Sequence, residues 1–375
     1  MTAGDGVLFA GAVVLPIVFG ALLVLVARKS AAQAPRPTKA ARRREGKPHA
    51  QPASWARLIV INLLVLGLLC SVLFLVLESY YRFVYDAPDA FGLTRISDRW
   101  FERHYHYNNA KVRDNIDYDL TPAPGRRRIT LLGDSFTAGH GIENVEARFG
   151  NRLRALGRWE IHVMARNGLD TGAQLKAISR LEEMGYVFDV VLLVYCLNDI
   201  ADIDPRWNEI LDRVYRDRGE ETFLLRHSFL LNTLYYRLRL RRDPDVGGYY
   251  DFVRRAYSSE IWDEQMVRLR AMHEAWPHEE VTFLVATFPF LHRLDQYDEY
   301  LPIHERLTDF WHGEGVAHLD LRHALSGRNP AQLVVSAHDP HPSRLAHQLV
   351  ADAIARFLDS HLRTEERRFP GSHAS

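Results

Sequence analysis

Cysteine is nearly absent from this chain of 375 residues, which contains only Cys70 and Cys196. Cys70 lies in a long apolar run and Cys196 in an expected strand, so we predict no disulfide between them, and cysteine usage indicates no redox compartment. Motifs such as His-Glu-x-x-His and cysteine pairs at metal-binding spacing are missing as well, which argues against a zinc enzyme.

Net charge is also absent, because 47 basic residues balance 47 acidic ones. The charges are unevenly distributed: residues 28–57 hold nine basic residues and one acidic residue, Glu45, so this segment carries +8. No other basic cluster indicates a nucleic-acid surface, and we expect no nucleic-acid partner. Hydrophobic residues make up 47% of the chain, as in folded proteins.

Two long apolar runs flank the basic segment. Residues 7–26 and 58–77 each pass 20 positions without a charged residue, enough for a helix to cross about 30 Å of hydrocarbon. They predict transmembrane helices over 7–27 and 58–78, with two buried core helices as the alternative. No basic region precedes the first run, so a cleavable signal peptide is not indicated.

The basic segment also predicts the orientation of this hairpin. Positive loops stay in the cytoplasm, so residues 28–57 are expected there as a disordered tether able to contact anionic membrane lipid. Both ends of the hairpin then face outward. We therefore expect a two-span protein of the cytoplasmic (inner) membrane, with the chain after about residue 79 periplasmic or extracellular.

For the chain after the second apolar run, we predict a juxtamembrane segment, 79–125, a folded domain over 126–362 and a disordered tail, 363–375. In the domain, apolar runs alternate with helical spacings, which predicts an α/β fold: three α/β/α layers around a parallel, flavodoxin-like, five-stranded sheet. The expected strands are 129–132, 161–165, 190–195, 281–286 and 316–321. The expected helices are 145–156, 175–184, 261–275, 301–312 and 344–362.

An insertion, 200–260, separates the third and fourth expected strands. Residues 224–240 within it have the spacing of one amphipathic helix. A helix that covers the sheet is the favoured interpretation. A lid over the site and a helix on the membrane surface are the alternatives.

A serine directly follows the first expected strand, in Gly133-Asp134-Ser135. Because α/β proteins place their sites at the carboxyl ends of parallel strands, Ser135 is a candidate nucleophile, provided that a base takes its proton. His341 is the candidate base, since the loop before the last helix returns to the same edge. Asp339 is the candidate partner of His341 Nδ1.

The next two strands end in possible hydrogen-bond donors. Gly168 follows the second strand and offers a backbone N–H that a ligand can approach closely. Asn198 follows the third strand and offers a side-chain amide. With the Ser135 N–H, these groups would form an oxyanion hole. Each has a structural explanation by itself, as a turn glycine or a helix cap, but the three fall at successive strand ends.

Four blocks in this order resemble the SGNH (GDSL-like) hydrolase superfamily. The blocks are Gly133-Asp134-Ser135, Gly168, Asn198-Asp199 and Asp339-Pro340-His341-Pro342, and they span about residues 126–362. The resemblance implies a bacterial membrane-anchored member with Ser135 as nucleophile, His341 as base, Asp339 as its partner, and Ser135, Gly168 and Asn198 at the oxyanion hole. It implies no cofactor and no metal.

Two departures from the family pattern concern the third and fourth blocks. Cys196 stands where members usually have glycine, and His338 stands three residues before the histidine, where many members have the acid. Asp339 is our choice as the group that orients His341. If the loop excludes it, a Ser–His pair remains.

These features predict a membrane-anchored, extracytoplasmic serine esterase that acts on an acylated cell-envelope glycan or lipid. An O-acyltransferase that modifies an exported polysaccharide uses the same machinery, and a non-catalytic envelope scaffold is the further alternative. Expected partners are the acyl-ester substrate, membrane lipid and, as a candidate, a membrane acyltransferase. A metal site is a less favoured alternative, built from His104, His106, His338, His341 and His347.

Overall fold

The computed structural model describes residues 2–32, 55–219, 221–277 and 279–368. These form two compact units, which we call the hairpin unit (Met1–Asp86 with Glu221–Tyr235) and the sheet unit (Ala87–Glu220 with Tyr236–Ser375). Most of the predicted cytoplasmic tether, 33–54, and the last residues of the tail, 369–375, lie outside the described residues.

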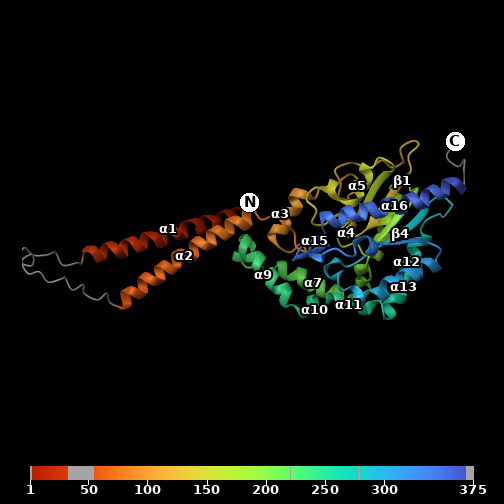
Figure 1. Ribbon diagram of the computed structural model, residues 1–375. Helices are drawn as coiled ribbons and strands as arrows, with labels where there is room; N and C mark the ends of the chain where they lie inside the picture. The colour runs from red at the N-terminus through yellow and green to blue at the C-terminus, as the bar shows by residue number, and fades with distance from the viewer. Residues whose placement is uncertain (1, 33–54, 220, 278, 369–375) are drawn as a thin grey trace, which may run out of the picture. The chain divides into compact units, whose positions relative to one another are not determined.

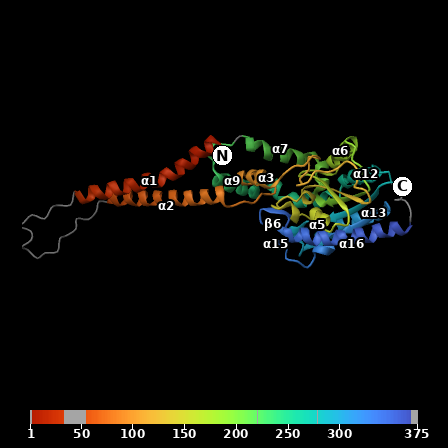
Figure 2. The ribbon, with the colours of Figure 1, turned by 90° about the horizontal axis from the view of Figure 1, so that it is seen from above.

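The hairpin unit is built on two long helices, α1 (Ala3–Ala32) and α2 (Trp55–Phe83), which lie side by side (Figures 1 and 2). Both are long and apolar enough to cross a membrane, and only 6% of the most apolar window of each is buried. Two core helices of a soluble domain would instead be mostly buried. The exposed apolar faces therefore fit the predicted spans better than that alternative.

The hairpin unit also contains the middle of the insertion, where Glu78 of α2 binds the start of a helix. The fully buried Glu78 carboxylate accepts hydrogen bonds from Ser228 Oγ at 2.7 Å and from the Phe229 and Leu230 N–H groups at 3.1 and 3.0 Å. Arg82 pairs with the same carboxylate at 2.7 Å. Glu78 thus satisfies N–H groups that a helix start leaves without partners.

This capping explains why the single helix expected over 224–240 is wrong. The segment forms two helices, α8 (Phe223–His227) and α9 (Phe229–Arg242), because Ser228 takes an extended conformation (φ −100°, ψ 123°). The Ser228 hydroxyl also accepts a hydrogen bond from the Leu231 N–H at 3.0 Å, so the break combines a local cap with a partner from a distant part of the chain.

The sheet unit confirms the predicted α/β architecture. Its parallel sheet has the order β2-β1-β3-β4-β5. The strands are β1 (Arg128–Gly133), β2 (Glu160–Ala165), β3 (Val190–Cys196), β4 (Thr282–Phe288) and β5 (Ala317–Asp320). Every residue of β1 and of β3 is buried, as expected of strands covered on both faces.

Helices cover both faces of this sheet. On one side α5 (Phe149–Ala155) packs against α16 (Arg344–Arg368), and on the other α6 (Thr171–Glu183) packs against α12 (Glu260–Glu274), as Figure 2 shows. The helix α13 (Leu301–Gly313) packs on β4 and β5. The last helix continues past its expected end at residue 362, so residues 363–368 of the expected tail are helical.

Shorter elements complete the unit. The helices are α3 (Arg95–His104), α4 (Ser135–Ala138), α7 (Pro205–Gly219), α10 (Pro244–Gly247), α11 (Tyr249–Ala256), α14 (Arg322–Leu325) and α15 (Pro330–Leu333). In the described residues, 3₁₀ turns cover Val145–Ala147, Leu197–Ile203, Leu291–Arg293 and Tyr297–Glu299. A two-stranded antiparallel ribbon, β6 (Val334–Ser336) and β7 (Asp339–Pro342), stands where we expected a loop.

The helix expected over 145–156 is also corrected. A 3₁₀ turn comes first and α5 begins only at Phe149, because Arg148 is extended (φ −65°, ψ 144°). Its side chain is fully buried and bonds to Asn151 Oδ1 and to the Arg113 carbonyl, both at 2.8 Å. These contacts fix the interruption.

Replacing Glu78 should release the α8–α9 segment. In Glu78→Ala the N–H groups of α9 lose their cap and buried Arg82 loses its counter-charge. Limited trypsin digestion of the full chain in detergent should then cleave at the exposed Arg226 several-fold faster than in the wild type. Glu274→Ala, at an exposed position of α12, is the matched control. Equal cleavage of Glu78→Ala and wild type would contradict the capping role.

Candidate active site

Ser135 is presented by a tight turn at the carboxyl end of β1. A side chain at Gly133 would not fit, because its Cβ would lie 2.3 Å from Thr137 Oγ1. The Asp134 carboxylate accepts a hydrogen bond from the Phe136 N–H at 2.9 Å and thereby caps α4. Strand, glycine and cap thus deliver the Ser135 hydroxyl to the sheet edge.

The structure brings Ser135, His341 and Asp339 together in one hydrogen-bonded row. His341 Nε2 lies 2.8 Å from Ser135 Oγ, and His341 Nδ1 lies 2.5 Å from Asp339 Oδ1. The His341 backbone N–H also donates to Asp339 Oδ1, at 3.1 Å. His338 is exposed, and its backbone N–H bonds to Ser336 Oγ, so the geometry favours Asp339 as the group that orients His341.

Both expected oxyanion donors line the same cavity as Ser135. Gly168 has a left-handed conformation (φ 74°), and the space around it is open, with no atom within 4 Å of where a Cβ would be. The Asn198 side-chain amide points back to the turn and reaches Asp134 Oδ2 at 3.4 Å. Both residues lie at strand ends on the serine's edge, as the sequence predicted.

Burial and neighbouring charge set the protonation of the row. Burial lowers the pKa of His341 below its usual value, an effect that His140 reinforces and Asp339 opposes. Burial by itself would raise the pKa of Asp339, but attraction to His341 and His140 holds it well below its usual range. The row is therefore poised as neutral imidazole beside ionised carboxylate, the resting state of a general base. Nearby, burial raises the pKa of Asp134 to about 6.

Ser135 opens into a large cavity of about 1130 Å³. One part of its lining is aromatic and includes Phe91, Phe101, Trp207, Tyr249, Tyr250 and Phe290. Another part is acidic and consists of Asp134, Asp170, Asp199, Asp202 and Asp295. Among the described residues, no Lys or Arg lines this cavity. Its volume slightly exceeds the usual range of about 300–1,000 Å³ for small-molecule sites.

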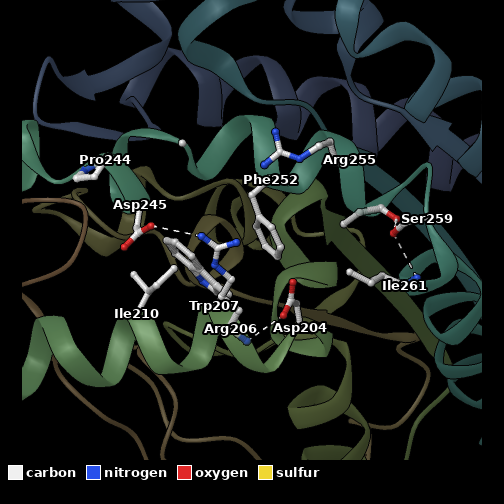
Figure 3. A pocket seen from close by; sticks show the side chains of 12 residues that line it. Asp204, Arg206, Trp207, Ile210, Pro244, Asp245, Phe252, Arg255, Ser259 and Ile261 are labelled. Carbon is white, nitrogen blue, oxygen red and sulfur yellow. Dashed lines mark hydrogen bonds and ion pairs between the residues drawn. The ribbon is translucent and has the colours of Figure 1, made fainter.

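A second, smaller cavity of about 360 Å³ is formed by α7, α10, α11 and the start of α12 (Figure 3). Trp207 belongs to the lining of both cavities, and its ring packs on Tyr249 with centroids 4.4 Å apart. None of Ser135, His341 and Asp339 lines the smaller cavity, so it is separate from the hydrogen-bonded row.

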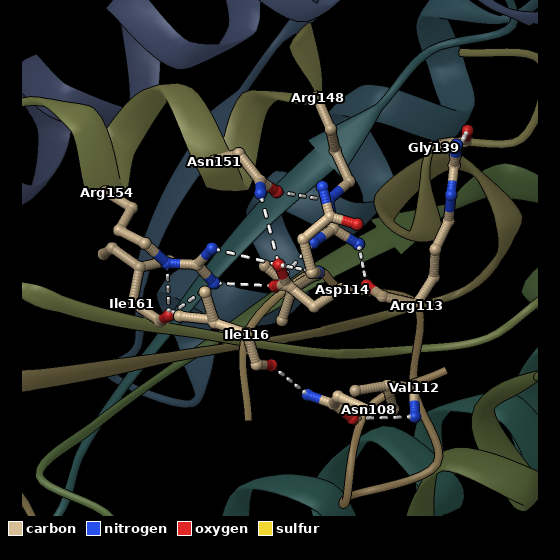
Figure 4. Close-up of polar contacts among 12 residues, drawn as sticks. Asn108, Val112, Arg113, Asp114, Ile116, Gly139, Arg148, Asn151, Arg154 and Ile161 are labelled. Atoms are coloured by element: carbon tan, nitrogen blue, oxygen red, sulfur yellow. Dashed lines mark hydrogen bonds and ion pairs between the residues drawn. The ribbon is translucent and has the colours of Figure 1, made fainter. Parts of the chain in front are cut away.

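The segment before β1 contacts the turn after α4 and the residues around α5 (Figure 4). Arg113 is buried, and its guanidinium donates to the carbonyls of Gly139 and Ile142 just after α4. Asn108 bonds to the Val112 N–H at 3.3 Å and to the Ile116 carbonyl at 3.0 Å, within its own segment. Arg113 therefore holds the turn after α4, and these residues have structural roles.

Sequence reasoning missed His140 and Asn167. His140 stacks on His341 with ring centroids 4.1 Å apart, and Asn167 Nδ2 lies 3.1 Å from His140 Nδ1. The motif around His140, Gly-His-Gly, matches no phosphate loop, and nothing else in the sequence indicated its place.

Ring nitrogens and a carboxylate oxygen of His140, Asp339 and His341 lie within 4.8 Å of one another, close enough to hold a metal ion. In this arrangement, however, His341 directs one nitrogen to Asp339 and the other to Ser135, which is hydrogen bonding rather than convergence on one point. Of the histidines considered for a metal site from sequence, only His341 belongs to this cluster.

No protein-family model matches the sequence, and no curated protein does. Solved structures do match. A protein assigned to the G-D-S-L lipolytic family from Desulfitobacterium hafniense is 13% identical over 62% of this chain and 100% of its own (TM-score 0.39). TesA is 14% identical over 62% of this chain and 98% of its own, with a TM-score of 0.39. A G-D-S-L lipolytic family member from Veillonella parvula is 14% identical over 61% of this chain and 97% of its own, with a TM-score of 0.38.

The lowered pKa of His341 predicts how the reactivity of Ser135 depends on pH. Only the neutral imidazole accepts the serine proton, and burial favours the neutral form, so Ser135 should stay reactive to a lower pH than an ordinary histidine allows. The labelling rate with a fluorophosphonate should rise with pH around a midpoint below 6.5. Ser135→Ala should not be labelled. A midpoint at or above 6.5 would show that burial does not control this base.

Proposed function

We propose that this chain is a membrane-anchored serine esterase that hydrolyses acyl esters through an acyl-enzyme. One observation carries the proposal: Ser135 Oγ, His341 Nε2, His341 Nδ1 and Asp339 Oδ1 form a continuous row with separations of 2.8 and 2.5 Å. A serine hydroxyl becomes nucleophilic when a base accepts its proton and a carboxylate orients that base.

In the proposed reaction, Ser135 Oγ attacks the ester carbonyl while its proton passes to His341 Nε2. Asp339 stabilises the imidazolium that forms. The N–H groups of Ser135 and Gly168 and the Asn198 amide bind the oxyanion. His341 then protonates the leaving alcohol and deprotonates a water, which releases the acid and restores the serine.

The cavity supports a substrate with a large part other than its reacting carbonyl. A volume of about 1130 Å³ far exceeds what an acetyl group fills. An anionic substrate would find no Lys or Arg in the described lining, and five aspartates line it. The aromatic residues offer apolar contact area. These features favour an uncharged or cationic ester, such as an acylated glycan or lipid of the cell envelope.

The same site supports an O-acyltransferase as the second candidate. The two reactions differ only in whether water or a sugar hydroxyl attacks the acyl-enzyme. A cavity of this size has room for an acceptor alcohol beside the acyl group, which is the observation that favours transfer. An exported polysaccharide would be that acceptor, and a membrane acyltransferase could supply acyl groups.

The anchor supports action outside the cytoplasm. The two helices could span a membrane by length and composition, and the +8 segment between them favours a cytoplasmic loop. The proposed location of the sheet unit is therefore the outer side of the cytoplasmic membrane.

Removing the nucleophile tests the proposed chemistry. Ser135→Ala should lower p-nitrophenyl acetate turnover by more than about 10³-fold, because the covalent route is lost. Its circular dichroism spectrum and melting temperature should match the wild type. Mass spectrometry with an acetylated donor and candidate glycan acceptors would then separate hydrolysis from transfer. Undiminished turnover by Ser135→Ala would exclude the assignment.

Topology is tested by reporters at the C-terminus. A fused alkaline phosphatase, which is active only outside the cytoplasm, should be active, and a fused green fluorescent protein exported through the same route should stay dark. Neutralising the basic residues of the loop should weaken this preference. The opposite pattern, with fluorescence and no phosphatase activity, would place the sheet unit in the cytoplasm.

A further inference from the structure

His140 lies in a turn that the chain holds in one conformation. It follows α4 between two glycines, Gly139 and Gly141, with φ angles of 76° and 81°. A side chain at Gly141 would be excluded, since its Cβ would lie 2.4 Å from Val335 Cγ2. Left-handed backbone on both sides of a residue requires glycine-like freedom. The turn is therefore built to point the His140 side chain in a fixed direction.

Buried neighbours hold this turn from outside. Arg113 donates to the carbonyls of Gly139 and Ile142, which flank the turn. Trp100 and Phe101 of α3 pack around the His140 ring, with centroids 6.1 and 5.3 Å away. His140 is buried as a result, with its side chain 4% exposed, so the ring has little freedom to reorient.

Hydrogen bonds indicate the tautomer of His140. Its Nε2 faces two acceptors, the Asp89 carbonyl at 3.2 Å and Asp339 Oδ2 at 3.3 Å, so Nε2 carries the proton. On the other side, the Tyr105 hydroxyl donates to Asn167 Oδ1 at 3.1 Å, which leaves the Asn167 amide nitrogen to donate to His140 Nδ1. This assignment places both ring nitrogens of His140 in polar contact.

Asp339 consequently lies between two imidazoles. Its Oδ1 faces His341 Nδ1, and its Oδ2 faces His140 Nε2. Asp339 Oδ2 is buried, and the described residues offer it no hydrogen bond of ordinary geometry. Its polar contact among these residues is His140 Nε2, which lies 3.3 Å away. A buried carboxylate oxygen without such a contact is costly and would favour rotation of the group.

We propose that His140 is a positioning residue for the esterase reaction: its Nε2–H fixes the Asp339 carboxylate and its ring face fixes the plane of His341. The stacked ring, 4.1 Å away at 22°, restricts rotation of the His341 imidazole. Both effects keep His341 Nε2 directed at Ser135 Oγ. Through Asn167, the same contacts reach the loop that carries Gly168. The inference rests on the proposed function.

Three variants separate the two contributions in the full chain in detergent. His140→Gln keeps an N–H donor without a ring, His140→Phe keeps the ring without a donor, and His140→Ala removes both. Misplacing a reacting group by about 1 Å costs about 10²-fold. We expect kcat for p-nitrophenyl acetate to fall by about this factor in His140→Ala with KM within threefold, and both His140→Gln and His140→Phe to lie between it and the wild type.

Two further variants provide a second test of the proposal and a matched control. Asn167→Ala removes the donor to His140 Nδ1 from an exposed position, so it should lower kcat in the same direction without lowering the melting temperature. His323→Ala, whose side chain is 72% exposed, is the matched histidine control and should match the wild type.

The proposal is overturned if His140→Ala and Asn167→Ala are folded and keep wild-type kcat, if the loss appears in KM only, or if neither His140→Gln nor His140→Phe exceeds His140→Ala. Failure of the proposed function gives a different result, since Ser135→Ala would then retain turnover whatever the His140 variants do.

Discussion

The Asp339 carboxylate is the group on which the arrangement of the site depends. It is fully buried, and a buried charge is tolerated only where other groups stabilise it. Its stabilising contacts come from separate parts of the chain: His341 from the same short strand, and His140 from the turn after α4. Satisfying one carboxylate therefore brings β7 to the carboxyl end of β1, where Ser135 lies.

Local patterns were sufficient to predict the sheet and the hydrogen-bonded row of Ser135, His341 and Asp339. The apolar run over 190–195 predicts a strand buried on both faces, and β3 is buried throughout. Ser135 follows directly from the strand before it. Asp339 and His341 are two residues apart, so their pairing could be predicted from the sequence alone. The sequence also favoured Asp339 over His338 as the group that orients His341, and the ribbon of β6 and β7, with residues 337 and 338 at its turn, supports that choice.

Features decided by distant partners were not predictable. The break at Ser228 depends on Glu78, 150 residues earlier. The interruption at Arg148 depends on the Arg113 carbonyl, 35 residues earlier. The role of His140 could not be predicted, because it depends on Asp339, which lies beside it only in the folded chain. A histidine between two glycines also has no periodicity or spacing that indicates burial. In each case a polar side chain overrides the local pattern because burial would otherwise leave it without partners.

The sheet unit also contains the segment that precedes residue 126. The turn-rich stretch ending at residue 125 marked the expected start of the fold, yet the segment before it carries the buried Asp114, which pairs with Arg148 and Arg154 at 3.0 and 2.7 Å. These ion pairs hold the pKa of Asp114 well below its usual range despite burial. Since neighbouring Arg113 fixes the turn that presents His140, a fragment that begins at residue 126 would lack both the counter-charge for α5 and the support of the site. The sheet unit accordingly begins at Ala87, before the expected start of the folded domain at residue 126.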